Sequence, residues 1–380
     1  MTLRKGNVVI NNTKSYICEM ADALKDMFSK KFYERLAHEL NIADKNIHPD
    51  KFVKDVTKGI DALSLNQRMR NTSVVLKKHL PDDYKKSIDT LFKVVPEFQK
   101  SYTALLFPDF VGQYGHHDFK TSMEALKHFT QFGSSEFAIR EFLKRDFDKT
   151  LSVMKKWAED KNHHVRRLAS EGSRPRLPWS FNLDEIAKNP NHTLPILEML
   201  KSDNELYVKK SVANHLNDFS RINPDWMLKV VNSWDRKNED TAWIVKHASR
   251  SLIKKGDQRS LAVFDYEKSP KVKILNFKIL NSKLKLGESL SFSFDIVSEK
   301  SKSQKLVIDY AIHYQKKSGE LAPKVFKLKD LNLKSKQKVS ISKSHRFMDF
   351  TTRKHYPGKH AFEIMLNGKP YGKKEFLLQS

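Results

Sequence analysis

Apolar residues recur with two different periods in the two parts of the chain. Up to about residue 266 they follow helical spacing within segments of roughly ten to fifteen residues, such as 31–40, 123–132 and 148–160. Beyond it they alternate with polar residues in short runs rich in Val, Ile, Phe and Tyr, at 289–298, 305–315, 338–347 and 360–368. The sequence therefore predicts a multidomain α plus β protein, with a helical domain over 1–264 and a β domain over 265–380.

A repeat runs through the helical part. The segments 163–170, 207–214 and 243–250 resemble one another, and offsets of 43 and 36 residues separate the matching positions Val165, Val208 and Ile244. A period of this length is typical of HEAT-like α-solenoids, in which inner helices stack side by side along a concave surface. The basic residues of the three segments would then line that surface: Arg166, Arg167, Lys209, Lys210 and Lys246. The alternative is that they belong to ordinary solvated helix faces.

The charge of the chain is strongly unbalanced. It has 70 Lys and Arg against 45 Asp and Glu, a formal net charge of +25. Residues 267–380 hold 25 of the basic and 10 of the acidic residues, so the β domain contributes +15. Such an excess favours a polyanionic partner, above all nucleic acid. A generic solubilising surface is the alternative, although its charges are usually nearer balance.

Cysteine content and hydropathy exclude several classes of protein. The single cysteine, Cys18, rules out disulfides within the chain and cysteine metal clusters. We expect a soluble cytoplasmic protein, because no apolar run is long enough for a signal peptide or a membrane span. The adjacent pairs His116–His117 and His163–His164 do not project together from a helix, and phosphate-binding glycine loops are absent. We therefore expect no metal, no cofactor and no NTPase activity.

The segment SEGSRPRLPWS, residues 170–180, interrupts the helical pattern. Its prolines lack the N–H that a helix needs, and Pro175 disfavours the α conformation for Arg174. The segment is therefore predicted to be a stiff loop that carries Arg174, Arg176 and Trp179. Trp179 either anchors this loop or, on a basic nucleic-acid surface, stacks on a base or sugar.

Three acids lie within the basic helical surface, where they weaken the attraction to a polyanion. Glu136 opens a helix, Glu171 closes the helix before the proline loop, and Asp218 is expected to close a helix of the next repeat. Each has an ordinary interpretation: a first-turn acid for Glu136, a salt bridge to Arg167 or Arg174 for Glu171, and a surface acid for Asp218. Glu171 and Asp218, however, are expected at equivalent ends of adjacent inner helices. This shared position gives a catalytic interpretation the same weight as the ordinary one.

The stretches SSEFAIR (134–140), HHVRRLASEGSRPRLPWS (163–180) and SVANHLND (211–218) together resemble the AlkC branch of the alkylpurine DNA glycosylases, a HEAT-like repeat family. The resemblance covers roughly residues 10–260. It implies excision of cationic N-alkylated bases from double-stranded DNA, chiefly N3-methyladenine and N3-methylcytosine. It further implies that Glu136, Glu171 and Asp218 are catalytic, that Trp179 faces the DNA, and that the β segment is an immunoglobulin-like domain, an antiparallel β-sandwich.

The expected chemistry suits carboxylates. Alkylation already leaves the base positively charged, so the acids need only stabilise an oxocarbenium-like sugar and position a water. The phosphates would be held by the basic residues of the helices and the loop, namely Arg166, Arg167, Arg174, Arg176, Lys209, Lys210 and Lys246. No lysine is placed to form a Schiff base in this group, which favours a monofunctional glycosylase. We expect it to act as a monomer.

Two other functions fit the same charge and repeats: a non-enzymatic HEAT scaffold for nucleic acid and an adaptor for acidic proteins. The three acids and the proline loop favour the enzyme over the scaffold. A steep salt dependence of duplex binding would distinguish a DNA-binding protein from the adaptor. For the β domain we expect a clamp on the duplex, because its charge is too one-sided for a passive role. The alternative is a cap over the apolar edge of the last helical repeat.

Overall fold

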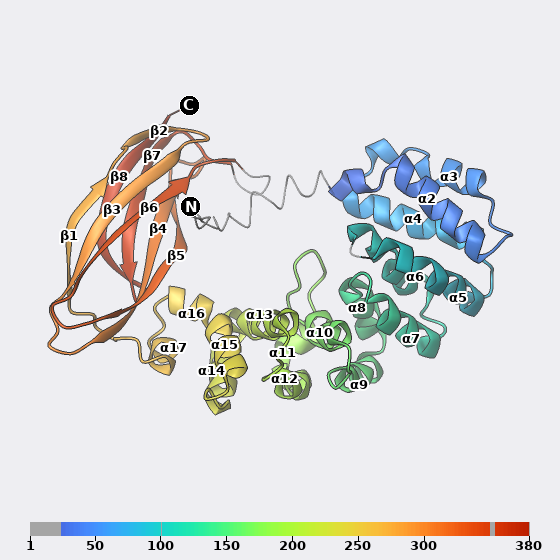
Figure 1. Cartoon of the computed structure of the whole chain (residues 1–380), viewed down its shortest axis with the longest axis horizontal. Helices are drawn as coiled ribbons and strands as arrows, with labels where there is room; N and C mark the ends of the chain where they lie inside the picture. The colour runs from blue at the N-terminus through green and yellow to red at the C-terminus, as the bar shows by residue number, and fades with distance from the viewer. Residues whose placement is uncertain (1–23, 100, 350–353, 380) are drawn as a thin grey trace, which may run out of the picture. The chain divides into compact units, whose positions relative to one another are not determined.

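The computed structural model describes residues 24–99, 101–349 and 354–379 (Figure 1). Cys18 lies outside this part. The chain divides into two compact units, Met1–Trp226 with Trp234–Ala248, and Met227–Ser233 with Ser249–Ser380. The described part of the first unit is helical and that of the second is largely β, as the two hydrophobic periods predict.

The helices before residue 249 are short and amphipathic. They are α2 Lys30–Ala43, α3 Pro49–Thr57, α4 Leu65–His79, α5 Tyr84–Val94, α6 Leu106–Tyr114, α7 Phe119–Phe129, α8 Glu136–Arg145, α9 Phe147–Trp157, α10 His163–Gly172, α11 Asp184–Lys188, α12 Leu194–Leu200, α13 Leu206–Ile222, α14 Pro224–Ser233 and α15 Glu239–Ala248. Four 3-10 turns join them: η1 Ile60–Ala62, η2 Val95–Phe98, η3 Tyr102–Leu105 and η4 Pro190–His192. Several N-termini are fixed by a polar side chain that accepts a backbone N–H, as at Ser29, Asp83, Asp118, Asn162 and Asn223.

One row of helices forms the inner layer of the solenoid. In the order α4, α6, α8, α10, α13 and α15, each helix packs on the next (Figure 1). The predicted repeat segments begin within α10, α13 and α15, so their side-by-side stacking is confirmed. Each helix of the row contributes a fully buried apolar side chain to the core, among them Leu76, Phe110, Ile139, Leu168, Val212 and Ile244.

Ion pairs recur at corresponding positions of two successive repeats. Arg166 of α10 donates to both oxygens of Asp203, at 2.6 and 3.2 Å, just before α13 begins. Lys209 of α13, which matches Arg166 in the repeat, pairs with Asp240 in the first turn of α15. Each pair joins one inner helix to the start of the next, so it contributes to the nearest-neighbour interface on which a solenoid depends.

The second unit contains a β-sandwich of two sheets, with strand orders β1-β3-β6 and β2-β8-β7-β4-β5. The strands are β1 Val272–Ile279, β2 Lys283–Lys285, β3 Ser289–Ser298, β4 Gln304–Gln315, β5 Leu321–Leu333, β6 Lys338–Arg346, β7 Gly358–Leu366 and β8 Lys369–Gln379. Neighbouring strands run antiparallel, as predicted, except that β2 runs parallel to β8. Alternate side chains such as Phe292 and Phe294 of β3 and Ile308 and Tyr310 of β4 fill the core between the sheets.

Two short helices, α16 Arg250–Lys254 and α17 Gln258–Val263, belong to the same compact unit as the sandwich. Ile253 of α16 and Leu261 of α17 form a small core with Val307 of β4. The domain boundary predicted between residues 264 and 265 falls after these helices and stays a prediction.

The turn between β7 and β8 meets the end of α16. Gly256 and Gly368 both have positive φ, and a Cβ on Gly368 would lie 2.1 Å from the Cα of Gly256. Beside them, the side-chain oxygen of Asn367 accepts the N–H of Val307 at 2.7 Å. Only glycine fits both the backbone conformation and the close approach at this point.

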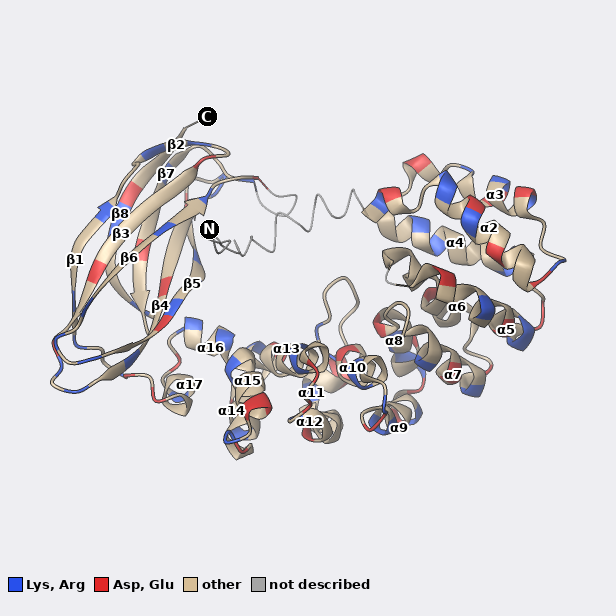
Figure 2. Cartoon of the chain, in the orientation of Figure 1, with Lys and Arg blue, Asp and Glu red and all other residues tan. Residues whose placement is uncertain are grey.

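Basic residues are distributed over the strands and connections of the sandwich and over the helices of the first unit, with acidic residues between them (Figure 2). None of the helices in the described part of the chain has the length and apolar composition that a membrane span requires.

Candidate active site

Glu136 is the first residue of α8. The side chain of Ser135, at the N-cap, makes no capping bond, whereas the Ser134 hydroxyl donates to Oε2 of Glu136 at 2.8 Å. The carboxylate therefore lies at the positive end of the helix dipole, where a negative charge is stabilised.

Glu171 and Asp218 come from the next two inner helices. α10 begins after Asn162 and ends at Gly172, because the prolines that follow prevent its continuation, as predicted. Asp218 does not close its helix as the sequence led us to expect. α13 continues one turn further, to Ile222, since the first proline after Asp218 is Pro224.

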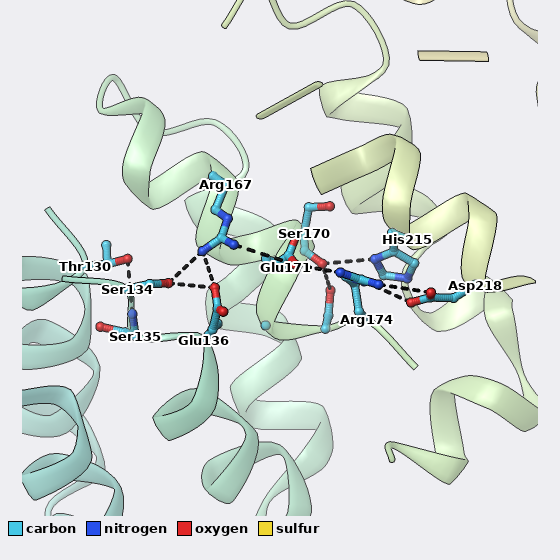
Figure 3. A network of polar contacts seen from close by, with 12 residues as sticks. Thr130, Ser134, Ser135, Glu136, Arg167, Ser170, Glu171, Arg174, His215 and Asp218 are labelled. Atoms are coloured by element: carbon cyan, nitrogen blue, oxygen red, sulfur yellow. Dashed lines mark hydrogen bonds and ion pairs between the residues drawn. The ribbon is translucent and has the colours of Figure 1, made fainter. Parts of the chain in front are cut away.

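The three acids and two arginines form one alternating row: Glu136, Arg167, Glu171, Arg174 and Asp218 (Figure 3). Arg167 pairs with Glu136 and lies 3.6 Å from Glu171. Arg174 lies 2.7 Å from Glu171 and donates to both oxygens of Asp218, at 2.9 and 3.0 Å. The salt bridges that were the ordinary interpretation of Glu171 therefore exist, and they join it to the other two acids.

The charge of this row is negative and its atoms are held in place. Three carboxylates and two guanidinium groups give the row a net charge of −1 when all are ionised. Their side chains are between 7% and 15% exposed, so water screens the pairs weakly. Charge-assisted hydrogen bonds of this kind fix both distance and direction. A negative row in a basic chain is suited to a cationic ligand.

The environment separates the pKa values of two of the acids. Burial alone would raise the pKa of Glu171, but Arg167 and Arg174 outweigh it and hold the pKa below its usual range. For Asp218 burial is the stronger effect and raises the pKa, although Arg174 donates two hydrogen bonds to this carboxylate. Glu171 therefore stays ionised, whereas Asp218 takes up a proton more readily.

A buried histidine lies beside the row. His215 lies one turn before Asp218 on α13, and burial lowers the pKa of its ring to about 3. The ring is thus neutral, and Nδ1 donates to the carbonyl oxygen of Ser170 at 3.0 Å (Figure 3). Nε2 lies 3.2 Å from the Thr193 hydroxyl. The histidine ties α13 to α10 at the residue that precedes Glu171.

A recess of about 300 Å³ opens beside the row. Its lining combines four members of the row with aromatic side chains: Glu136, Arg167, Glu171, Arg174, Tyr102, Phe137, Trp179 and Tyr207. Trp179 also lines a second hollow of about 380 Å³, together with Arg70 and Asp109. Trp179 is 59% exposed, which does not fit a plug that anchors its loop.

Comparisons with known proteins agree with this arrangement. A model of the DNA alkylation repair enzyme family matches residues 66–252, and a model of the immunoglobulin-like C-terminal domain of the uncharacterised protein YhaZ matches residues 273–380. Uncharacterized protein YhaZ of Bacillus subtilis (strain 168) is 40% identical over 351 residues, which covers 92% of this chain and 97% of that protein. The alkylpurine DNA glycosylase AlkC of Pseudomonas fluorescens was solved bound to DNA containing an abasic site analog. It is 44% identical, with a TM-score of 0.91 over 94% of this chain and 99% of that one.

The chain belongs to the AlkC-type alkylpurine DNA glycosylase family. The HEAT-like solenoid and the immunoglobulin-like sandwich that the sequence predicts are both confirmed. Among the described residues, no group of three or more His, Cys, Asp or Glu side chains is arranged to hold a metal ion.

The basic residues predicted to contact DNA occupy three different settings in this AlkC-type fold. Arg167 and Arg174 belong to the alternating row, and Arg166 and Lys209 form the pairs between repeats. The remaining three have exposed side chains: Arg176, Lys210 and Lys246. Contact of any of them with DNA stays a prediction.

Sequence reasoning missed part of the aromatic lining and the anchor of the loop. Tyr207 lies against Arg167, whose guanidinium carbon is 4.6 Å from the ring centroid. Tyr207 is the first residue of the repeat segment 207–214, so an aromatic residue at the start of an inner helix was the available signal. Phe137 directly follows Glu136, and Arg140 lies one turn later on α8 at a fully buried position. A charged residue amid apolar helix positions was the available signal for Arg140.

Proposed function

We propose that this chain hydrolyses the N-glycosidic bond of cationic N-alkylated bases in double-stranded DNA, N3-methyladenine and N3-methylcytosine foremost. The observation that carries the proposal is the buried row in which Arg167 and Arg174 hold Glu136, Glu171 and Asp218. All of its members except Asp218 line a recess together with Trp179. The AlkC of Pseudomonas fluorescens, bound to DNA containing an abasic site analog, supports it, because an abasic site is what such a reaction leaves.

The proposed reaction needs little proton transfer. The bond between C1′ of the sugar and the alkylated base breaks, and its electron pair leaves with the base and neutralises the positive charge. The sugar becomes an oxocarbenium-like cation, which a water attacks at C1′ while a carboxylate takes the released proton. Because the base leaves neutral, no side chain has to protonate it. The site must instead stabilise positive charge, which the row is suited to do.

The two buried acids take different parts in this scheme. Glu171, which stays ionised between two arginines, stabilises the cationic sugar electrostatically. Asp218, whose pKa burial raises, is the better acceptor for the proton of the attacking water. Glu136 holds Arg167 in place through its ion pair and completes the negative row. Trp179 and Tyr207 supply flat apolar surface for a sugar or base.

Duplex DNA is the proposed partner of both domains. The exposed side chains of Arg176, Lys210 and Lys246 are proposed to contact phosphates. The sandwich, with its net charge of +15 over residues 267–380, is proposed to bind the duplex as a clamp. These contacts supply affinity, whereas the row supplies the chemistry.

The decisive experiment measures release of free base. Purified protein, incubated in EDTA with methylated duplex DNA, should liberate N3-methyladenine and leave a strand that breaks only on later alkali treatment. Strand cleavage that borohydride traps as a covalent complex would contradict the monofunctional assignment. Absence of base release alongside normal duplex binding would leave a non-enzymatic nucleic-acid scaffold as the function.

Substitutions assign the roles. Glu171→Gln and Asp218→Asn each remove a charge with little change in shape, so we expect the single-turnover excision rate to fall by about 100-fold or more. The Kd for undamaged duplex should stay within about twofold, because the interaction that is removed acts in the transition state. Glu124→Gln, at an exposed position of α7, is the control and should excise normally. Normal excision by both row variants would exclude a catalytic role.

A further inference from the structure

The loop after α10 holds two parts of the proposed site. Arg174 at its start bonds Glu171 and Asp218, and Trp179 stands near its end. Trp179 has a φ of 67°, a left-handed conformation that a residue with a Cβ rarely adopts, because the Cβ crowds the backbone carbonyl. Its exposed side chain is not packed tightly enough to impose this conformation. The rest of the loop must therefore impose it.

Arg140 of α8 bridges the two ends of this loop. Nη1 donates to the carbonyl oxygen of Gly172 at 3.0 Å and to that of Arg174 at 2.6 Å. Nη2 donates to the carbonyl oxygen of Phe181, and the guanidinium carbon lies 5.4 Å from the centroid of the Phe181 ring. One side chain thus fixes the position where the loop leaves α10 and the position just after Trp179.

The environment of Arg140 is unusual for a charged side chain. It is fully buried, and burial lowers the pKa of the guanidinium to about 10, which leaves it protonated at neutral pH. Within the described part of the chain its hydrogen bonds go to backbone carbonyls rather than to a carboxylate, and Nε has no partner. Its charge still acts on the three acids of the row. The hydrogen bonds of this buried cation all go to one loop, which indicates that Arg140 maintains the conformation of that loop.

We propose that Arg140 is a positioning residue for the excision reaction, a role that rests on the function proposed above. It holds the loop 172–181 so that Arg174 aligns Glu171 with Asp218 while Trp179 lines the recess. A planar guanidinium is required because its separate N–H groups reach carbonyls at both ends of the loop. A lysine ammonium is a single point that reaches only part of this set.

The test compares Arg140→Met and Arg140→Lys in the full-length chain, each with and without Trp179→Phe. Subtracting the Trp179→Phe signal isolates the fluorescence anisotropy of Trp179 from the other tryptophans. Single-turnover excision of methylated duplex and the Kd for undamaged duplex are measured on the same proteins. Arg68→Lys is the matched control, because Arg68 is also nearly buried and donates to backbone carbonyls, those of Leu63, Lys25 and Phe28.

We expect Arg140→Met to lower the excision rate by about 100-fold, the usual effect of misplacing a catalytic group by roughly 1 Å. Arg140→Lys should show an intermediate loss, since it restores the charge and some of the hydrogen bonds. In both, the anisotropy of Trp179 should fall, while the duplex Kd stays within about twofold. Arg68→Lys should change neither the rate nor the anisotropy.

Three results would overturn the proposal. The first is a folded Arg140 variant with a wild-type rate, and the second is a slow variant in which the anisotropy of Trp179 is unchanged. The third is failure of both variants to fold, which would make Arg140 a purely structural residue. If the wild-type protein itself released no base, the proposed function would fail, whereas the anisotropy would still decide whether Arg140 orders the loop.

Discussion

The neutral, buried state of His215 predicts how the stability of the helical unit depends on pH. Burial lowers the pKa of this ring to about 3, against 6.5 for an ordinary histidine. The unfolded chain therefore binds a proton near pH 6.5 that the folded chain refuses until about pH 3. The stabilisation from a neutral His215 is complete above the unfolded pKa and is lost as the pH falls below it.

The magnitude follows from the gap between the two pKa values. At pH 5 the unfolded histidine is almost fully protonated and the folded one almost fully neutral, which costs about 2 kcal/mol relative to pH 8. For a unit of this size, that corresponds to a fall in Tm of about 4–8 °C. Because His215 is fully buried, solvent screening does not reduce this effect.

The assay follows helical circular dichroism during thermal unfolding of the wild-type chain and His215→Asn at pH 8 and pH 5. The asparagine amide can still donate to the Ser170 carbonyl but cannot titrate. Between pH 8 and pH 5, the free energy of unfolding should therefore fall by about 2 kcal/mol less in this variant than in the wild-type chain. Comparing the two chains cancels the contributions of other groups, including Asp218. Equal losses of stability in both chains would show that the fold does not hold His215 neutral.

Two further predictions concern the sandwich. Gly368→Ala should destabilise the second unit by about 2 kcal/mol or more, because the new Cβ would clash with Gly256. Gly287→Ala is the control: no atom crowds its Cβ, so it should cost only about 1 kcal/mol, which its positive φ accounts for. Urea unfolding checks this, and equal costs would contradict the close approach. Replacing the exposed lysines of β8 by Gln should make the slope of log duplex affinity against log salt concentration shallower, by about 0.9 for each phosphate contact that is lost. An unchanged slope would show that this strand is not part of the proposed clamp. The lysines are Lys369, Lys373 and Lys374.

The division of the fold could be read from the sequence because it depends on local pattern. Helical spacing gave way to alternation near residue 266, and the repeat between α10, α13 and α15 appeared as matching apolar positions. The boundary of the compact units could not be read in the same way. α16 and α17 have a helical pattern, yet their apolar side chains pack on Val307 of β4, an interaction that local sequence does not encode.

The acids of the candidate site could be singled out from the sequence, but the ion pairs that join them could not. Glu136, Glu171 and Asp218 could be found because acids in a basic surface are conspicuous. That Arg174 joins Glu171 to Asp218 depends on the path of the loop after α10, which in turn depends on Arg140, a residue on another helix. Likewise, Arg166 and Lys209 looked like unpaired surface cations, since the acids they bind lie more than thirty residues further along the chain.

The alternating row takes one acid from each of three consecutive inner helices, α8, α10 and α13. Solenoids change length in evolution by gaining or losing whole units, and here such a change has unequal consequences along the chain. A unit inserted or deleted between α8 and α13 would move one carboxylate out of reach of its arginine and disconnect the site. A unit gained before α4 would leave the row intact. Among homologues of this protein, the number of repeats is therefore expected to vary at the N-terminal end of the solenoid and not in its middle.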